Sequence, residues 1–292
     1  MQPRKFGRTG LSVSPLGFGA GQIGDDSLTE RDAEYLLHSL PDLGINMIDT
    51  ARGYGLSEER IGKYLAHRRD EFILSTKVGY GIEGTEDWTY DCIIKGVDTA
   101  RKQLRTGVID IVHLHSCSEY ILRNNGVLDA LLECRHRGWL KVPAYSGENE
   151  DLAFALSSGI IQSLQTSVNI FDQKSLRMYI PGARELGMGI IGKRSLANVC
   201  WHHQTQPHGH YCEQYWIRMK ELQYKTDIPY HELLIRFAVF SGGADTSLVG
   251  GKNPDNIKRN IAIVEKGPLP DEVIKMILTR YQEIGSNWEG LI

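Results

Sequence analysis

Four polar residues in the first half of the chain have the side-chain types needed for acid–base chemistry at a carbonyl group. Asp49, Lys77 and His115 each stand at the end of a short apolar segment. Tyr54 follows Asp49 by five residues, in a glycine-flanked loop. One such residue alone is more often a paired surface group or a packed core side chain, so the prediction depends on the four lying together at one face.

This set is suited to giving a proton to a carbonyl oxygen. A tyrosine with the ordinary pKa of about 10 is a poor donor at neutral pH, and a neighbouring ammonium such as that of Lys77 stabilises its phenolate. We expect Asp49 to keep Lys77 charged and oriented, and His115 to hydrogen-bond the carbonyl oxygen. Because no side chain carries a hydride, a cofactor is required. Run backward, the same set makes Tyr54 a base and the protein a dehydrogenase of an alcohol.

Short apolar segments alternate with amphipathic ones along most of the chain, without a linker that would divide it. Strands are predicted at residues 15–18, 46–49, 72–77, 109–115, near 144–145, and at 163–168, 189–192 and 247–249. The nearly continuous apolar run at 109–112 is typical of a parallel strand that is covered on both faces. A short hairpin is expected over residues 5–13, turning at Arg8, Thr9 and Gly10.

Helical periodicity predicts the elements between these strands. Helices are expected at residues 29–43, 57–67, 91–104, 126–137, 148–156, 173–185, 212–224 with 230–240, and 254–264, with an extra C-terminal helix at 270–288. The first has Thr29 as its N-cap and ends before Gly44. Eight strand–helix units in about 250 residues fit a (β/α)8 TIM barrel, one domain over residues 1–292, with catalytic groups at the carboxyl ends of its strands.

Composition narrows the choice of partners. The chain has 292 residues, 41% of them hydrophobic, and a formal net charge of -3, which describes a folded protein without a basic surface for nucleic acid or an anionic membrane. It has no long apolar span and no signal-peptide pattern at its start, so we expect a cytoplasmic protein. Five cysteines without CxxC spacing argue against a disulfide framework or structural zinc site. The expected partner is a small molecule, and nothing indicates an oligomeric state.

The longest motif surrounds Asp49 and Tyr54. Residues 44–62 read GINMIDTARGYGLSEERIG, and this segment resembles the G-x-x-x-x-D-T-A-x-x-Y-G-x-S-E-x-x-[IL]-G pattern of aldo-keto reductases. Residues 7–14 and the region up to Asn260 extend the resemblance over nearly the whole chain. Residues 110–115, DIVHLH, resemble the family's D-[LI]-x-x-L-H, whose last residue is catalytic, so the resemblance favours His115 over His113. It implies that Asp49, Tyr54, Lys77 and His115 form the catalytic tetrad.

The resemblance also implies a set of cofactor contacts. Ser146 and Gln165 would hold the nicotinamide carboxamide, and the Gly19-Ala20-Gly21 segment and Asp49 would lie near the nicotinamide. The residues expected at the pyrophosphate and the adenosine are Lys193, Arg194, Leu196, Asn198, Gly250, Lys252, Asn256 and Asn260. Lys252 would face a 2′-phosphate at a helix N-terminus, which favours NADP(H) over NAD(H).

Three positions depart from the family pattern. Segment 141–146 looks short for a fifth strand and contains Pro143, which cannot donate to a sheet ladder, so we expect a local distortion beside the nicotinamide pocket. Gly147 stands where asparagine is frequent, and Arg259 where glutamate is commoner. Both substitutions are expected to affect cofactor affinity.

Two loops leave alternatives open. Trp88 and Tyr80, after Lys77, either form an apolar wall for the substrate or pack their loop onto the barrel. A second loop holds four histidines (His202, His203, His208 and His210) between Cys200 and Cys212. Without a helical i, i+4 pair, that loop fits a polar surface loop better than a metal site, and no metal is expected.

The resemblance allows two functions. The first is an NADP(H)-dependent oxidoreductase that interconverts an aldehyde, ketone or sugar carbonyl with an alcohol. The alternative is a nucleotide-sensing regulatory or binding protein on the same barrel, with little turnover. The intact tetrad favours the enzyme.

Overall fold

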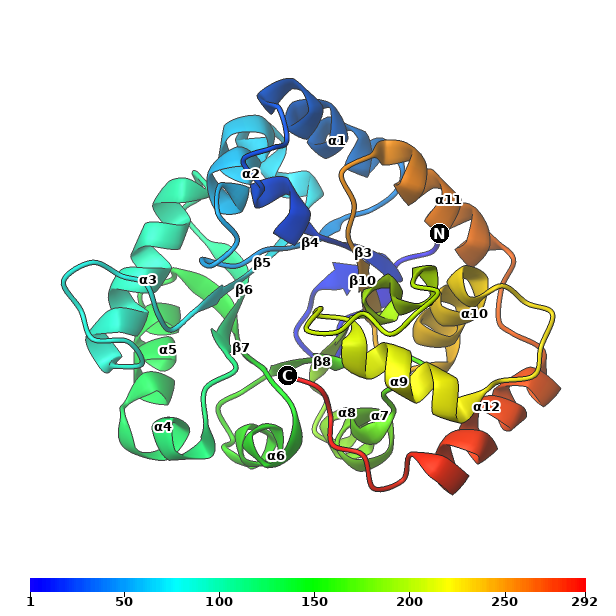
Figure 1. Ribbon diagram of the computed structural model, residues 1–292. Coiled ribbons are helices and arrows are strands. Elements are labelled where there is room, and N and C mark those ends of the chain that lie inside the picture. Colours follow the sequence, from blue (N-terminus) through cyan, green and yellow to red (C-terminus); the bar gives the residue numbers. More distant parts are fainter.

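Eight parallel strands close into a barrel in the computed structural model, which describes residues 1–292 (Figure 1). Around the barrel the strands are β3 (Leu16–Gly19), β4 (Met47–Asp49), β5 (Ile73–Val78), β6 (Ile109–His115), β7 (Leu140–Ser146), β8 (Ser163–Ser167), β9 (Gly189–Lys193) and β10 (Thr246–Val249). The barrel closes where β10 pairs with β3. All eight predicted strands are present, and the predicted TIM barrel is confirmed.

The N-terminal hairpin covers one end of the barrel. Strands β1 (Arg4–Lys5) and β2 (Ser12–Val13) pair antiparallel, as predicted. Phe6 between them is fully buried in the cluster that fills the barrel interior, beside Met47, Ile111 and Ile191. A Cβ atom at Gly189 would lie only 2.3 Å from the Phe6 ring, so a glycine is needed there. Since this end is filled, a ligand can enter only at the carboxyl ends of the strands.

Helices surround the barrel on its outside (Figure 1). In chain order they are α1 (Glu30–Asp42), α2 (Ser57–Leu65), α3 (Tyr90–Gln103), α4 (Glu119–Asn124), α5 (Val127–His136), α6 (Asn149–Ser157), α7 (Lys174–Met178), α8 (Ile180–Glu185), α9 (Glu213–Leu222), α10 (Tyr230–Arg236), α11 (Pro254–Glu265) and α12 (Asp271–Ile284). Thr29 caps α1 as expected, because its side chain accepts a hydrogen bond from the Asp32 amide. The apolar face of α1 packs into the main hydrophobic core.

The structure differs from the prediction mostly in the loops and short helices. The single helix predicted at 173–185 is two helices that meet at Tyr179, because Pro181 lies in the first turn of α8, where its missing N–H is tolerated. Helix α4 and the short helical turns η1 (Ala20–Gly24) and η3 (Ala197–His202) were not predicted. Two of these turns lie at the open end of the barrel.

The expectation of a short, distorted strand at Pro143 was wrong. Strand β7 has seven residues and pairs with β6 along its length, with Val112 opposite Pro143. The carbonyl of Pro143 accepts a hydrogen bond from the Gln162 amide, on the side of β8. In a parallel ladder a residue's N–H and C=O point to the same neighbour, and β8 pairs only from Ser163 onward. The missing donor therefore falls where no partner strand is yet present.

The C-terminal segment crosses back over the open end of the barrel. After α12 the chain turns at Gly285, and the amide of Leu291 donates to Asp172 at 3.0 Å. Figure 1 shows the C-terminus near the centre of the barrel. No helix has the length and apolar character required to cross a membrane.

Candidate active site

A tight loop after β4 carries Tyr54 back over the barrel. The Leu56 amide donates to the Gly24 carbonyl at 3.1 Å, which binds this loop to η1. A Cβ atom at Gly24 would lie 1.6 Å from the Tyr54 carbonyl oxygen, so only glycine permits this approach. The Tyr54 ring lies beside Gly21, where a Cβ atom would be 3.7 Å from it. The glycines of the first barrel loop thus make room for the tyrosine loop.

The four predicted catalytic residues lie together at the open end. Lys77 Nζ is 2.6 Å from Asp49 Oδ2 and 2.8 Å from the Thr50 carbonyl, and it lies 4.9 Å from the centre of the Tyr54 ring. The Tyr54 and His115 rings are 6.1 Å apart, edge to face. Burial alone lowers the pKa of Lys77, but Asp49 and Tyr54 raise it by more, so the pKa lies above its ordinary value. The buried ammonium therefore stays charged beside Tyr54.

His115 is a neutral imidazole held by a second tyrosine. Burial, together with the nearby charges of Lys77 and Lys193, lowers the pKa of His115 to about 3. Tyr80 stacks on the His115 ring at 5.5 Å, and its hydroxyl oxygen is 2.9 Å from His115 Nδ1. A neutral imidazole at this position can donate one hydrogen bond without adding a second positive charge.

His113 lies deeper in the barrel, away from the open end. It is fully buried, and its Nε2 is 3.1 Å from Ser75 Oγ. Ser75 in turn donates to Asp49 Oδ1 at 2.7 Å. His113 is therefore linked to the far side of the Asp49 carboxylate and is not part of the cavity wall, whereas His115 is.

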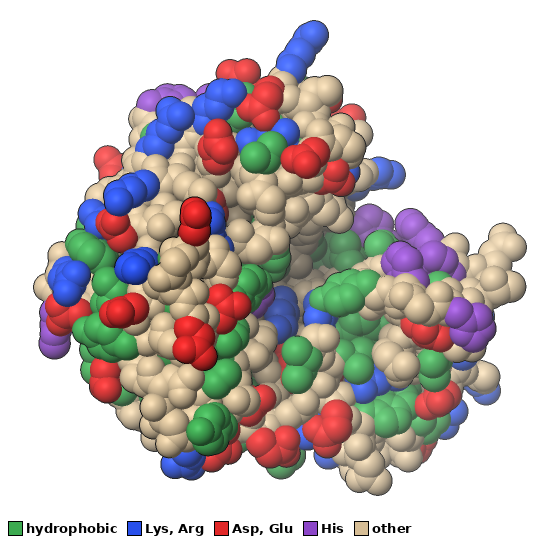
Figure 2. All heavy atoms as spheres, turned by 60° about the vertical axis from the view of Figure 1, so that its left-hand side comes forward, with side chains coloured by type: hydrophobic (Ala, Val, Ile, Leu, Met, Phe, Trp, Pro, Cys, Tyr) green, Lys and Arg blue, Asp and Glu red, His purple; other side chains and the backbone are tan.

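A cavity of about 1160 Å³ opens at this end of the barrel. The tetrad lies on its wall, together with most of the predicted cofactor contacts: Gly19, Gly21, Ser146, Gln165, Lys193, Arg194, Leu196, Asn198, Gly250, Lys252, Asn256 and Asn260. The hollow is visible in Figure 2, with histidine side chains gathered on one rim. Its size suits a ligand as large as a dinucleotide.

Two predicted site residues, Ala20 and Trp88, do not line the cavity. Ala20 is fully buried, and its carbonyl accepts a hydrogen bond from Ser57, so it serves the packing of η1 on α2. Trp88 packs behind Tyr80, with the ring centres 5.8 Å apart, and covers the Cα of Gly79. The aromatic side chain that reaches the cavity from this loop is Tyr80.

The part of the cavity beside Ser146 and Gln165 has an unused hydrogen-bond donor. Ser146 Oγ donates to Gln165 Oε1 at 3.0 Å, which fixes the amide of Gln165. Its Nε2 is buried and has no partner within the protein. A buried donor without a partner is costly, and a carboxamide oxygen in the cavity would satisfy it. These residues therefore fit a nicotinamide.

The two adjacent cations after β9 have different partners. Lys193 Nζ lies 3.3 Å from Glu148 Oε1 and 3.5 Å from Ser146 Oγ. Burial lowers the pKa of Lys193, an effect that Glu148 only partly offsets. The Arg194 guanidinium donates to the Tyr211 hydroxyl and to the Leu291 carbonyl. Both cations line the cavity, and each has its own partner within the protein.

Lys252 stands on the opposite wall, before α11. Its Nζ is 2.6 Å from Asp25 Oδ2, so it bridges the loop after β10 to the loop after η1. Asn260 is buried and its Oδ1 is 2.8 Å from His231 Nε2, while Asn256 accepts a hydrogen bond from Arg259. The Arg259 side chain therefore lines the cavity beside the predicted adenosine contacts.

Several residues of this site had no sequence signal of their own. Gln22, Asp25 and Tyr211 line the cavity, and the buried Glu148 contacts Lys193. None of the four belongs to the motifs that predicted the site. For Tyr80 the sequence did offer a signal: its position after Lys77 made it a candidate for the wall of the substrate site.

Comparison with known proteins now bears on this geometry. The model of the Aldo/keto reductase family matches residues 15–280. The chain belongs to the aldo/keto reductase family. It is accordingly an oxidoreductase enzyme, of a family whose members use nicotinamide cofactors.

Individual members of the family are similar over most of their length. An aldo-keto reductase from Bacillus halodurans, in its holo form, has a TM-score of 0.82 at 28% identity and covers 96% of each chain. Pyridoxal 4-dehydrogenase from Microbacterium luteolum is 24% identical over 332 residues, covering 93% of this chain and 95% of that protein. D-threo-aldose 1-dehydrogenase from Pseudomonas sp. is 26% identical over 294 residues, covering 86% and 89% respectively.

Proposed function

We propose that this aldo/keto reductase interconverts a carbonyl and an alcohol with NADP(H), using Tyr54 as the general acid or base. The observation that carries the proposal is the Lys77 ammonium, which is buried between Asp49 and Tyr54 at the open end of the barrel. A bound nicotinamide cofactor would supply or accept the hydride at the carbonyl carbon. Ser146 and Gln165 would hold its carboxamide.

In the reducing direction, the protein's own residues manage the carbonyl oxygen. Tyr54 gives its hydroxyl proton to that oxygen, and Lys77 stabilises the phenolate that remains. Asp49 offsets the charge of Lys77, so the buried pair is neutral before the reaction. His115, kept neutral, donates a hydrogen bond that orients the same oxygen. In the oxidising direction the Tyr54 phenolate takes up the alcohol proton.

The choice of NADP(H) rests on Lys252. This lysine precedes α11, whose first residues are Pro254 and Asp255 after the N-cap Asn253. A helix N-terminus and an adjacent ammonium both favour a phosphate group. The 2′-phosphate of NADPH would replace the Asp25 carboxylate as the partner of Lys252.

The substrate class is an aldehyde, a ketone or a sugar. The cavity wall near the tetrad is polar, with His115, Ser116 and Lys193 beside Tyr80. Such a lining suits a substrate with hydroxyl groups. The relative from Pseudomonas sp., a D-threo-aldose 1-dehydrogenase, is consistent with this choice.

The test is the Tyr54→Phe variant. It should lose at least about a hundredfold in kcat with a panel of aldehydes, ketones and sugars, because proton transfer is removed. NADPH binding, followed by fluorescence, should stay within about twofold of the wild type. Tyr35→Phe, on the exposed face of α1, is the matched control and should keep full activity.

Two outcomes would contradict the proposal. Turnover near that of the wild type in Tyr54→Phe would remove Tyr54 from the reaction. A wild-type protein that binds NADPH but turns over no carbonyl or alcohol would instead favour a nucleotide-sensing role. The relatives also include a protein named as a channel subunit. This probable voltage-gated potassium channel subunit beta from Oryza sativa subsp. japonica is 34% identical over 122 residues, which cover 39% of this chain and 37% of that protein.

A further inference from the structure

The segment between β9 and α9 forms one wall of the cavity and carries a group of side chains that the proposed reaction does not use. It begins with η3, in which Asn198 and Val199 have φ angles of 51° and 53°. After this turn the segment runs to Cys212 at the start of α9. Asn198, Trp201 and Tyr211 face the cavity.

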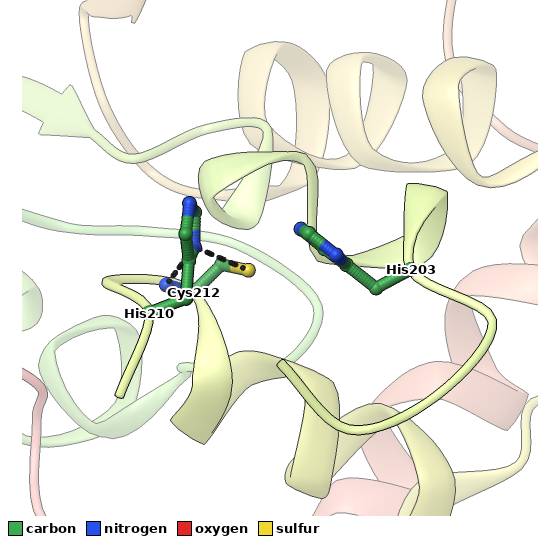
Figure 3. Close-up of side chains that lie close together, drawn as sticks. All are labelled: His203, His210 and Cys212. Atoms are coloured by element: carbon green, nitrogen blue, oxygen red, sulfur yellow. Dashed lines mark hydrogen bonds between the residues drawn. The ribbon is translucent and has the colours of Figure 1, made fainter. Parts of the chain in front are cut away.

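On this segment, His203, His210 and Cys212 converge. One ligand atom from each lies within 4.8 Å of the other two. His210 Nδ1 is 3.1 Å from Cys212 Sγ, and the two imidazole rings have centres 5.2 Å apart. Figure 3 shows the Cys212 thiol between the two rings. The thiol is buried, His203 is half-buried and His210 is exposed, so the group is open to solvent on one side.

We propose that His203, His210 and Cys212 bind a divalent transition metal ion of the Zn²⁺ type. Two imidazoles and a thiolate are nitrogen and sulfur ligands of the kind that zinc prefers, and a water molecule can complete a tetrahedron on the open side. Zinc bonds of about 2.0–2.3 Å place tetrahedral ligands roughly 3.3–3.8 Å apart. The three donors therefore need to move together by only about 1 Å. Cys212 binds as the thiolate, and its proton passes to solvent.

Hydrogen bonds around the group already hold the backbone of each ligand. The Trp216 indole donates to the His203 carbonyl at 2.9 Å, and the His203 amide donates to the Cys200 carbonyl at 3.2 Å. The His210 amide donates to the Pro207 carbonyl and the Trp216 amide to the Cys212 carbonyl, both at 3.0 Å. These bonds remain when His210 Nδ1 exchanges its 3.2 Å bond with the Cys212 amide for the metal. Because the loop is folded before the ion arrives, binding costs less ordering than in an unstructured peptide.

The other two histidines of the loop serve different contacts. His208 lies 3.1 Å from Glu213 Oε1, and Glu213 also accepts from Gln206 and from the Gly209 amide. His202 packs edge to face on Trp201 and lines the cavity. These two are therefore matched comparisons within the same loop.

A metal ion here would fix the cavity wall. Tyr211 lies between two of the ligands in the sequence, and its hydroxyl accepts a hydrogen bond from Arg194. Its carbonyl accepts one from Asn198 at 3.3 Å. Holding His210 and Cys212 on one ion would hold Tyr211 over both of these predicted cofactor contacts. The proposed role of the ion is thus structural.

The test is metal binding by the whole protein, without reference to its activity. The purified chain is stripped with a chelator and titrated with Co²⁺. We expect one ion per chain, with tetrahedral d–d bands and a thiolate-to-cobalt charge-transfer band, and stoichiometric displacement by Zn²⁺. Cys212→Ser should abolish the charge-transfer band, and His203→Ala and His210→Ala should each weaken affinity by at least roughly tenfold. Zn²⁺ should raise the Tm of the wild type and leave that of Cys212→Ser unchanged.

The matched controls are His208→Ala in the same loop and Cys134→Ser in α5, which should both bind as the wild type does. Circular dichroism checks that each variant is folded. If Cys212→Ser does not fold, the two histidine variants decide the question. The proposal is overturned if the wild type binds no stoichiometric ion, or if His203→Ala and His210→Ala bind as tightly as the wild type.

Discussion

Lys77 is an ammonium group buried at 2% exposure, and its neighbours determine what it can do. A buried charge without a partner costs several kcal/mol, and here Asp49 and the Thr50 carbonyl both accept hydrogen bonds from it. The part of the Lys77 charge that Asp49 does not offset acts on Tyr54. Each of the four residue types is common by itself, and only their separation of a few ångströms gives them a joint role. The proposed function therefore depends on all four residues together.

The contact between Tyr80 and His115 leads to a testable prediction. Its hydroxyl at 2.9 Å from His115 Nδ1 would donate to that nitrogen, leaving the Nε2 proton for the substrate oxygen. Tyr80→Phe removes this bond while keeping the ring that stacks on His115. We expect a loss of about 1 kcal/mol of transition-state stabilisation, a roughly fivefold fall in kcat/KM.

Steady-state kinetics and NADPH binding measure this effect. Cofactor affinity should be unchanged, because the Tyr80 hydroxyl hydrogen-bonds His115 and Tyr80 is not one of the predicted cofactor contacts, and Tyr120→Phe on an exposed face is the control. An unchanged kcat/KM in Tyr80→Phe would show that the orientation of His115 does not depend on this hydroxyl.

At the scale of elements, the carboxyl ends of the strands supply the chemistry and the loops supply the walls. Strands β4, β5 and β6 are adjacent in the barrel, so their carboxyl ends bring Asp49, Lys77 and His115 together. The β10–α11 and β3–η1 loops meet across the cavity at Lys252 and Asp25, which are 40% and 47% exposed. An exposed pair of this kind contributes little to stability and is free to exchange partners.

This contact predicts how the cofactor is chosen. Lys252→Ala should raise the Kd for NADPH by roughly tenfold or more, because a charge-assisted hydrogen bond to the 2′-phosphate is lost. Asp25→Asn should lower it by roughly twofold, because the competing carboxylate is gone. NADH, which has no 2′-phosphate, is the control ligand, and its Kd should be insensitive to both substitutions.

Fluorescence titration with the two cofactors gives all six dissociation constants. Equal losses for NADPH and NADH in Lys252→Ala would place this lysine at a part of the cofactor that both share.

For the whole molecule, the buried interior of the barrel links stability to pH. Burial lowers the pKa of His113 from 6.5 to about 3. Between these two values the unfolded chain binds a proton at this residue and the native chain does not. The contribution of His113 to stability is therefore complete above pH 6.5 and is lost progressively as the pH falls towards 3, by up to about 1.4 kcal/mol per pH unit.

His113→Gln isolates this effect, since glutamine does not titrate and can still hydrogen-bond Ser75. Urea unfolding at pH 7 and pH 5 should show that the wild type loses about 2 kcal/mol more than the variant on acidification. His136→Gln, at an exposed position, should track the wild type at both pH values. If the wild type and His113→Gln differ by the same free energy of unfolding at pH 7 and at pH 5, the prediction is wrong.

Local pattern was sufficient for the barrel and for grouping the predicted catalytic residues at one end of it, while the choice of His115 over His113 came from the family resemblance. Strand and helix periodicities are properties of neighbouring residues, and closing eight parallel strands places every carboxyl end at one face, so Asp49, Lys77 and His115 could be grouped before any distance was known. The expectation of a distorted strand at Pro143 was wrong because the effect of a proline in a sheet depends on where the partner strand begins. The prediction of one helix at 173–185 was wrong because Pro181 lies in the first turn of a second helix.

Loop paths, by contrast, are fixed by contacts between residues far apart in the chain, and no periodicity encodes them. Tyr80 replaces Trp88 at the cavity because the Trp88 ring covers Gly79. Lys193 and Arg194 separate because Glu148 and Tyr211 reach them from other loops. His203 meets His210 and Cys212 because the chain between them turns where the His210 amide donates to the Pro207 carbonyl, although their spacing fits no helix. Folding brings such residues together through packing, which the order of the residues alone does not show.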